Sequence, residues 1–263
     1  MKAELNGITL AYSDRGDGLP LVLLHGFPLC RKMWRSQNEA LTKAGCRVIT
    51  PDLRGFGESG LTSGVVSMDI YADDIVALMD HLGIDKAVVG GMSMGGYVLL
   101  NLLERYPDRV AAPIFMVTKA GDDDDAGKAR RTALAEACRA QGILPVAEAF
   151  NNILFAPATM ADNPELVAEV FGWMNATDPE GAVAGLIAMR DRKGHVDLLG
   201  SISQPALVIG ADQDRAVPEE NSRIIAEGLP DAKLCILQGG GHMVNLEQPE
   251  EFNEAILAFL EGL

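Results

Sequence analysis

Ser93 stands between glycines in the segment Gly91-Met92-Ser93-Met94-Gly95, which matches the pattern G-x-S-x-G. An apolar run typical of a β-strand precedes this segment, and an apolar pattern with helical spacing follows it. Small residues on both sides of a serine permit a sharp turn from strand to helix, which exposes the hydroxyl beside the helix N-terminus. The alternative is a glycine-rich tight turn with an incidental serine. We favour a nucleophile, because a strand and a helix occur where such a turn needs them.

A serine nucleophile needs a base, and the chain has four histidines. His81 falls in an amphipathic helical pattern, and His195 lies in the polar segment RDRKGHVD, where we expect it to be exposed. His25 ends a strand pattern that comes too early in the chain to carry the base. His242 follows the last strand pattern in the glycine-rich loop QGGGHMVNLEQPEEF, from which its imidazole can reach the serine. We therefore predict that His242 is the base.

Two aspartates compete for the third position, in which a carboxylate orients the imidazole and stabilises its charged form. Both Asp212 and Asp214 follow the strand pattern PALVIGA. We prefer Asp214, because it lies just before the helix start predicted at Pro218, and Asp212 stays open as the alternative. The resulting chain order of serine, aspartate and histidine is the order expected for a serine on a strand-to-helix turn.

Backbone N–H groups must also stabilise the negative charge that develops on a carbonyl oxygen during acyl transfer. Met94 offers one N–H at the helix start, and we expect its side chain at the pocket wall. The segment HGFP offers a second N–H at Phe27, and Gly26 permits a close approach of the backbone. By itself HGFP indicates only a turn after a strand, and its occurrence together with GMSMG gives it weight.

The elements that must position these residues alternate between strand and helix patterns in the first part and the last part of the chain. This alternation predicts an α/β fold with a largely parallel sheet and helices on both faces. Between about Lys119 and Leu198 no strand pattern occurs, and alanine-rich helical patterns follow the acidic run GDDDDAGKARR. We expect residues 1–118 and 199–263 to form the α/β core and residues 119–198 to form a helical cap.

Five segments resemble the α/β-hydrolase fold superfamily in content and order: LVLLHGFP, PDLRGFGES, GGMSMGG, ALVIGADQDRAVP and GGGHMVNLEQPEEF. They extend over almost the whole chain and leave only the helical insertion unmatched. More narrowly, the chain resembles small serine esterases, non-haem haloperoxidases and 3-oxoadipate enol-lactonases. The resemblance implies an eight-stranded, mostly parallel sheet with the cap inserted after the sixth strand. It also supports a Ser93, Asp214 and His242 triad, with Phe27 and Met94 at the oxyanion hole.

Two details of the sequence bear on this resemblance. The family usually leaves two residues between the glycine that ends the strand and the aspartate, whereas three separate Gly210 from Asp214 here, so only the position of Pro218 favours Asp214. Asp52 and Arg54 belong to PDLRGFGES, which is shared widely across the family. We interpret them as scaffold, because charged residues in turns mostly make local hydrogen bonds.

A serine with a histidine base performs acyl transfer, in which the hydroxyl attacks a carbonyl and water then hydrolyses the acyl-enzyme. We therefore predict a carboxylic ester hydrolase that acts on a small-molecule ester and uses no cofactor and no metal ion. The alternatives with the same triad are a lactonase, an enol-lactonase or a C–C bond hydrolase, and perhydrolysis stays open. A ligand-binding, receptor-like module is the alternative from another class, and a complete triad argues against it.

The cap is expected to close the substrate pocket and to select the acyl group. Large apolar residues of the cap, with one tryptophan that follows HGFP, are candidates for the pocket wall, and packing between cap and core is the alternative for each. These candidates are Trp34, Phe150, Phe155, Trp173, Met174 and Met189. Such a pocket carries few charges, which favours small to medium uncharged esters.

The composition limits the partners and the compartment. The 37 acidic residues exceed the 22 basic ones, for a formal net charge of −15, which argues against nucleic acid because phosphate contacts need clustered Lys and Arg. We see no signal peptide and no apolar run long enough for a bilayer, so we expect a cytoplasmic protein without a membrane partner. The four scattered cysteines are expected to be reduced thiols, and the oligomeric state stays open.

Overall fold

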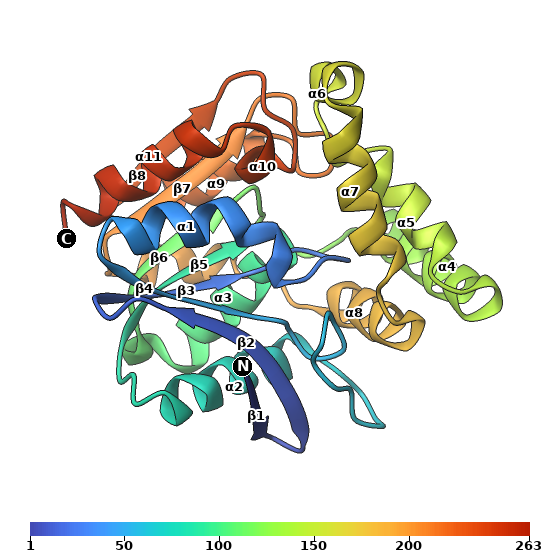
Figure 1. Cartoon of the computed structure of the whole chain (residues 1–263), viewed down its shortest axis with the longest axis horizontal. Coiled ribbons are helices and arrows are strands. Elements are labelled where there is room, and N and C mark those ends of the chain that lie inside the picture. The colour runs from blue at the N-terminus through green and yellow to red at the C-terminus, as the bar shows by residue number, and fades with distance from the viewer.

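The computed structural model describes residues 1–263, and its centre is a single sheet of eight strands in the order β1-β2-β4-β3-β5-β6-β7-β8 (Figure 1). The strands are β1 (Lys2–Leu5), β2 (Ile8–Arg15), β3 (Leu19–Leu24), β4 (Cys46–Pro51), β5 (Ala87–Met92), β6 (Val110–Met116), β7 (Ala206–Ala211) and β8 (Ala232–Leu237). The pairs β1–β2 and β2–β4 are antiparallel and all others are parallel, so the predicted mostly parallel sheet is confirmed.

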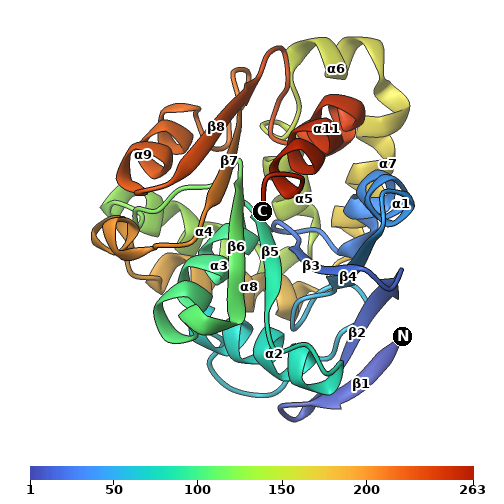
Figure 2. The same cartoon turned by 90° about the vertical axis from the view of Figure 1, so that its left-hand side faces the viewer.

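Helices cover both faces of the sheet, which Figure 2 shows from the side. One face is covered by α1 (Arg35–Lys43), α10 (Val244–Glu247) and α11 (Pro249–Leu260), and the other by α2 (Met68–His81), α3 (Met94–Arg105) and α9 (Glu220–Gly228). Short 3-10 helices are formed by Arg31–Trp34, Pro107–Arg109 and Val196–Ser201. Every residue of β5 and β7 is buried, as expected for parallel strands that are covered on both faces.

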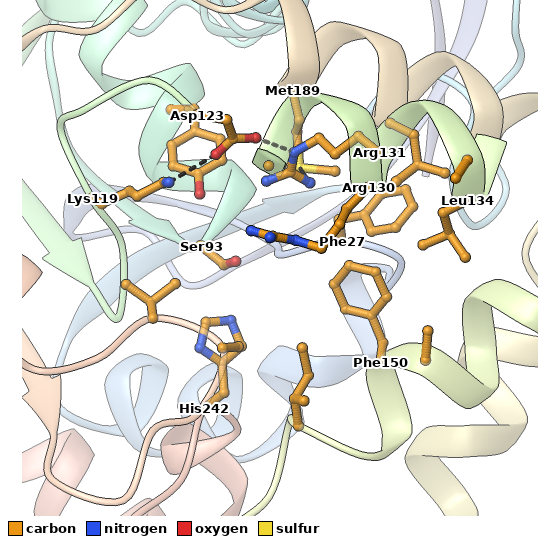
Figure 3. A pocket seen from close by; sticks show the side chains of 18 of the residues that line it. Phe27, Ser93, Lys119, Asp123, Arg130, Arg131, Leu134, Phe150, Met189 and His242 are labelled. Carbon is orange, nitrogen blue, oxygen red and sulfur yellow. Dashed lines mark hydrogen bonds and ion pairs between the residues drawn. The ribbon is translucent and has the colours of Figure 1, made fainter. Parts of the chain in front are cut away.

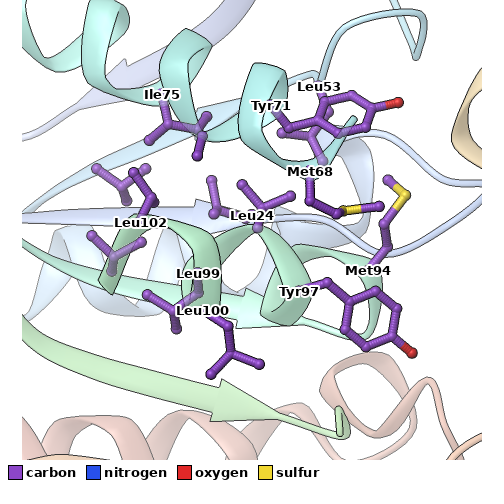
Figure 4. Packing of buried hydrophobic residues seen from close by; sticks show 14 of the residues in the cluster. Leu24, Leu53, Met68, Tyr71, Ile75, Met94, Tyr97, Leu99, Leu100 and Leu102 are labelled. Carbon is purple, nitrogen blue, oxygen red and sulfur yellow. The ribbon is translucent and has the colours of Figure 1, made fainter. Parts of the chain in front are cut away.

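The helix that follows Ser93 is anchored by apolar packing. Leu99 and Leu102 of α3 lie among Leu24 of β3 and Ile75 of α2, all fully buried (Figure 4). Burial of a side chain of this size stabilises the fold by about 1.5–3 kcal/mol. The N-terminus of α3 is therefore held in a fixed place against the sheet.

Five helices are inserted between β6 and β7, and we call them the cap helices. They are α4 (Asp125–Gln141), α5 (Leu144–Asn151), α6 (Pro157–Asp162), α7 (Pro164–Asn175) and α8 (Pro179–Asp191), which gather at the right of Figure 1. Prolines begin α6, α7 and α8, and the side chains of Asn163 and Asp178 cap α7 and α8. A proline after a capping residue starts a new helix, so the inserted segment is divided into short helices.

Two elements differ from the sequence patterns. The strand patterns number seven, and β1 is the eighth strand, which its mixed sequence Lys2–Leu5 does not reveal. The sequence patterns also do not reveal α8, which precedes the polar segment around His195, because this helix is largely buried and lacks a clear amphipathic pattern.

All four cysteines are free thiols, and Cys235 is only half-buried. No helix in the structure combines the length and the apolar character that crossing a membrane requires.

Candidate active site

Ser93 occupies a sharp turn between β5 and α3. Its φ of +54° lies in the left-handed region, which is strained for a residue with a side chain and persists only where the surroundings enforce it. Two hydrogen bonds do so: Ser93 N–H donates to Met116 O at 3.0 Å, and the Thr118 hydroxyl donates to Ser93 O at 2.8 Å. These bonds fix the turn in a conformation that places the Ser93 side chain beyond the end of β5.

The glycines around the turn are required by close backbone approaches. A Cβ on Gly91 would lie 2.3 Å from Gly95 O, and a Cβ on Gly95 would lie 2.3 Å from Leu24 O. Gly26 approaches from the end of β3, where an added Cβ would lie 3.3 Å from Ser93 Cβ. The segment HGFP thus lies directly beside the serine, as the oxyanion-hole prediction requires.

His242 and Asp214 form a buried pair on the loops that follow β8 and β7. His242 Nδ1 lies 2.7 Å from Asp214 Oδ2, and the other carboxylate oxygen accepts the backbone N–H groups of Ala216 and Val217 at 2.8 Å each. Because an ionised carboxylate only accepts, Nδ1 carries the proton and Nε2 remains free to accept one. This is the tautomer that a general base for a serine needs.

Asp212 makes different contacts. Its Oδ1 accepts the backbone N–H of Gly239 at 2.6 Å, and its Oδ2 accepts the side-chain amide of Gln213 at 3.2 Å. These bonds connect the ends of β7 and β8 and leave Asp212 without contact to the imidazole. Of the two aspartates, only Asp214 stands where a triad carboxylate would.

A cavity of about 580 Å³ opens between the carboxyl ends of the strands and the cap helices α4, α5 and α8 (Figure 3). Ser93 and His242 face this cavity from the core, and no hydrogen bond joins the serine hydroxyl to the imidazole. Phe27, Phe150 and Met189 line it, as do Leu134, Ile153, Leu186 and Val217. Catalytic hydrogen bonds are often long before substrate binds, so the arrangement suits a serine and its base.

Four residues expected in the pocket lie elsewhere, and that expectation is wrong for them. Trp34, Phe155 and Met174 are fully buried in the apolar cluster that joins the cap helices to the α10–α11 face of the sheet. Trp173 of α7 lies outside this cavity and packs against the core, where the guanidinium of Arg35 lies 5.2 Å from its ring centroid. A large apolar side chain is suited both to lining a cavity and to packing between the cap and the core. Hydrophobicity alone therefore does not indicate which side of a helix faces the cavity.

The two residues predicted for the oxyanion hole contribute through their backbones. Met94 is the first residue of α3, so its N–H has no acceptor within the helix, and the N–H of Phe27 has no acceptor in the protein. The side chain of Met94 is not at the pocket wall as expected. It lies in the core cluster with Met68 and Tyr71 (Figure 4).

The cavity wall on the cap side carries charges, contrary to the expected pocket with few charges. Asp123 accepts Lys119 Nζ at 2.8 Å, Arg131 Nε at 2.5 Å and Arg192 Nη2 at 2.9 Å. Burial acts to raise the pKa of Asp123, but the hydrogen bonds from these three cations hold it well below its ordinary value. The carboxylate is therefore ionised throughout the neutral and mildly acidic range.

Asp123, Arg130 and Arg131 belong to GDDDDAGKARR, in which the four consecutive aspartates obscure the helical pattern of the residues that follow. Gly127, Arg130, Arg131 and Leu134 recur at helical spacing, and all four line the cavity. The periodicity was a usable signal, since positions three and four apart share one face of a helix. What the pattern could not show is that this face would be turned toward the serine.

The two other buried histidines have local roles. His25 Nε2 accepts the N–H of Leu53 at 2.9 Å, so its protonated Nδ1 donates to Gly26 O at 2.9 Å. His195 is buried rather than exposed as expected, and its Nε2 lies 3.2 Å from Glu104. Burial lowers the pKa of both histidines. Neither lines the cavity, and His25 orients the HGFP turn.

Asp52 and Arg54 also make local contacts outside the cavity. Asp52 accepts the backbone N–H groups of Arg31 at 2.7 Å and Glu58 at 2.8 Å, and Arg54 forms a buried two-point ion pair with Asp74 at 2.7 and 2.8 Å. These contacts have a structural role, because they connect the turn after β4 to the 3-10 helix Arg31–Trp34 and to α2.

Comparison with known proteins places the chain in a family. The family model described as the alpha/beta hydrolase fold matches residues 20–249. The chain belongs to this family. A thermophilic esterase from Thermogutta terrifontis resembles this α/β hydrolase with a TM-score of 0.95 and 37% identity, over 100% of this chain and 98% of that one.

Two enol-lactonases are also similar to this α/β hydrolase. The structure of the enol-lactonase from Burkholderia xenovorans has a TM-score of 0.92 and 28% identity, over 99% of this chain and all of that one. The curated 3-oxoadipate enol-lactonase 2 of Acinetobacter baylyi is 30% identical, over 98% of this chain and 93% of its own length. The relatives thus include both esterases and enol-lactonases.

Proposed function

We propose that this α/β hydrolase is a carboxylic ester hydrolase with Ser93 as nucleophile, His242 as general base and Asp214 as the carboxylate that orients the imidazole. The observation that carries the proposal is the 2.7 Å contact between His242 Nδ1 and Asp214 Oδ2, at a cavity that Ser93 also lines. Nucleophile, base and orienting group on three separate loops of one sheet edge are the requirements of acyl transfer.

The reaction would follow from the positions of these groups. His242 Nε2 takes the proton of the Ser93 hydroxyl as Oγ attacks the ester carbonyl, and the N–H groups of Phe27 and Met94 stabilise the oxyanion. His242 then returns the proton to the departing alcohol, which leaves an acyl group on the serine. Water, activated by the same imidazole, attacks the acyl-enzyme and releases the acid.

A lactonase is the second candidate, because two enol-lactonases are similar over nearly the full chain. A lactone is an internal ester, so the same groups would act and the departing alcohol would stay attached to the acyl chain. The difference lies in the shape of the substrate rather than in the residues that perform the reaction.

The test is a substrate panel combined with covalent labelling. Purified protein is assayed with p-nitrophenyl esters of increasing acyl length, with lactones, with a dienoate ketone, and with hydrogen peroxide as acyl acceptor. We expect ester hydrolysis, and an alkylphosphonofluoridate should label Ser93 in peptide mapping. Negligible ester turnover beside rapid lactone turnover would favour the second candidate. Stoichiometric labelling of another residue would contradict the assignment of the nucleophile.

A further inference from the structure

Helix α4 turns one face toward the cavity beside the serine. The α4 residues that line the cavity lie along one side of the helix: Gly127, Arg130, Arg131, Ala133, Leu134 and Ala137. Arg139 comes nine residues after Arg130, which corresponds to about half a turn around the helix. Both arginines are exposed, but only Arg130 lines the cavity. Arg130 thus belongs to the inner face of the helix and Arg139 to the outer face.

Arg130 is the one cation of the cavity without an anionic partner. Lys119 and Arg131 both bind Asp123, whereas the guanidinium of Arg130 makes no ion pair and no hydrogen bond. In Figure 3 it reaches from α4 over the cavity toward Ser93. An unpaired guanidinium beside a nucleophile is available to a ligand.

The balance of charge around the cavity is opposite to that of the whole chain. Three lining residues, Lys119, Arg130 and Arg131, carry positive charge and only Asp123 carries negative charge, while the chain has a net charge of −15. Asp123 also binds Arg192, so one carboxylate is shared among three cations. The residues that line the cavity therefore carry an excess of positive charge.

Apolar side chains surround this cation. Phe27 and Phe150 form an edge-to-face pair with ring centroids 5.0 Å apart, and Leu134 and Ile153 line the same space. A hydrocarbon chain fits such walls, but an uncharged ligand offers the guanidinium of Arg130 no ionised acceptor. A carboxylate matches its planar set of donors with two parallel hydrogen bonds.

We propose that Arg130 is an anion-binding subsite and that the preferred substrate is an ester or lactone with a free carboxylate, separated from the reacting carbonyl by a short hydrocarbon chain. This substrate class rests on the proposed hydrolase function and replaces the uncharged ester expected from the sequence. The bound carboxylate holds the chain along the wall that Phe27 and Phe150 form, so that the carbonyl at its other end faces Ser93.

Monomethyl esters of linear dicarboxylic acids test this substrate class. Each half-ester of about four to eight carbons is compared with the same molecule carrying a primary amide in place of the free carboxylate. We expect the kcat/KM of the wild-type protein to be at least about tenfold higher for the acid than for the amide. In Arg130→Gln this preference should disappear, chiefly through a higher KM for the acid.

Arg139→Gln is the matched control, because it makes the same change of charge on the opposite face of the same helix. It should keep the preference for the acid. If the wild-type protein hydrolyses acid and amide equally, or if Arg139→Gln loses the preference as fully as Arg130→Gln, the subsite is wrong.

Binding without turnover separates the subsite from the proposed function. Titration calorimetry with free dicarboxylates, on the wild-type protein and on Arg130→Gln, should show about tenfold weaker binding to the variant. Carboxylate binding through Arg130 in a protein that hydrolyses no ester would support the subsite and refute the proposed function. Ser93-dependent ester hydrolysis without any difference in carboxylate binding would refute the subsite and leave the proposed function standing.

Discussion

The two walls of the cavity are built in different ways. On the core side, Ser93 and His242 stand on loops at the ends of parallel strands, and close backbone contacts leave their positions little freedom. On the cap side, Lys119, Asp123 and Arg131 are held by an ion-pair cluster on the segment that follows β6, and Arg130 is held by nothing. Backbone contacts fix the positions of the residues in the core wall, whereas side-chain ion pairs fix those in the cap wall.

This difference indicates a division of tasks. Acyl transfer needs its groups within a fraction of an ångström of one geometry, which rigid strand ends provide. Choice of substrate needs only a surface of suitable charge and shape, which exchangeable helix residues provide. Changes in the core wall should therefore affect every substrate alike, and changes in the cap wall should affect selectivity or stability.

The largest effect is expected for Ser93→Ala. Removal of the hydroxyl removes the nucleophile, so kcat for every ester should fall by at least about 10⁴-fold, with little change in the melting temperature. Steady-state kinetics on neutral and anionic esters provide the measurement. Ser63→Ala, at an exposed loop position, is the control and should be fully active. Retention of normal activity by Ser93→Ala would remove the basis of the comparison between the walls.

The two aspartates after β7 provide the next test. Asp214→Asn should lower kcat by about 10³- to 10⁴-fold, because an amide at this position favours the wrong tautomer of His242. Asp212→Asn removes only a bond to a backbone N–H at the end of β8 and should lower kcat by less than about tenfold. Kinetics of both variants on one ester measure the contrast, and a reversed order would assign the triad to Asp212.

On the cap wall, Asp123→Asn should affect stability more than the chemical step. Loss of this carboxylate leaves three cations unpaired, among them the buried Arg192, and should lower the free energy of unfolding by about 3 kcal/mol. Chemical denaturation at pH 7 measures it. The exposed neighbour Asp122, which lies 3.5 Å from Lys128, is the control, and Asp122→Asn should change stability by less than about 0.5 kcal/mol.

The pH dependence of the same cluster follows from the low pKa of Asp123. A carboxyl whose folded pKa is depressed stabilises the protein above its unfolded pKa, about 3.9, and loses that contribution as the pH falls through the folded value. The difference in the free energy of unfolding between the wild-type protein and Asp123→Asn should therefore be constant from pH 5 to pH 8. A difference that shrinks within this range would show that Asp123 is not held ionised by its three partners.

The smallest effect is expected where the two walls meet, at Glu247. Its carboxylate accepts the N–H of Ala156 at 2.9 Å and the Thr159 hydroxyl at 2.6 Å on the cap, and the N–H of Gly241 at 3.1 Å beside His242. Burial raises the pKa of Glu247 above its ordinary value despite these bonds. Ionisation of this group in the folded protein therefore has a cost.

Glu247→Gln should reveal that cost as a trend with pH. A raised folded pKa means that the stability contributed by Glu247 is complete below its unfolded pKa and decreases as the pH rises through the folded value. The variant should be less stable than the wild-type protein by about 1 kcal/mol near pH 4.5, with a smaller deficit at pH 8. Denaturation at both pH values measures the trend. A deficit that grows with pH would contradict it, and exposed Glu250→Gln should show no trend.

Much of the fold could be predicted from the chain because its signals are local. The buried apolar runs of β5 and β7, and the helical pattern after Ser93, depend on neighbours in sequence. By contrast, β1 is an edge strand of only four residues, whose alternation of polar and apolar side chains is too short to indicate a strand, and it pairs with β2. Strands of that kind are decided by pairing, which sequence patterns do not show.

The candidate site divides in the same manner. Ser93, His242, the HGFP turn and the loop that carries Asp212 and Asp214 could be located in advance, because each follows a strand and parallel strands end at one edge of the sheet. The residues that line the pocket could not be predicted, because Trp34 and Phe150 are both large and apolar and only Phe150 faces the cavity.

The sequence by itself determined the α/β architecture, the turn that carries Ser93 and the order of the residues that surround it. Only the tertiary structure decided between Asp212 and Asp214, buried His195, and turned Arg130 toward the serine. The physical reason is the range of the interactions. Turns and periodic patterns arise between near neighbours, whereas the face that a helix presents is set by packing against elements far away in the chain.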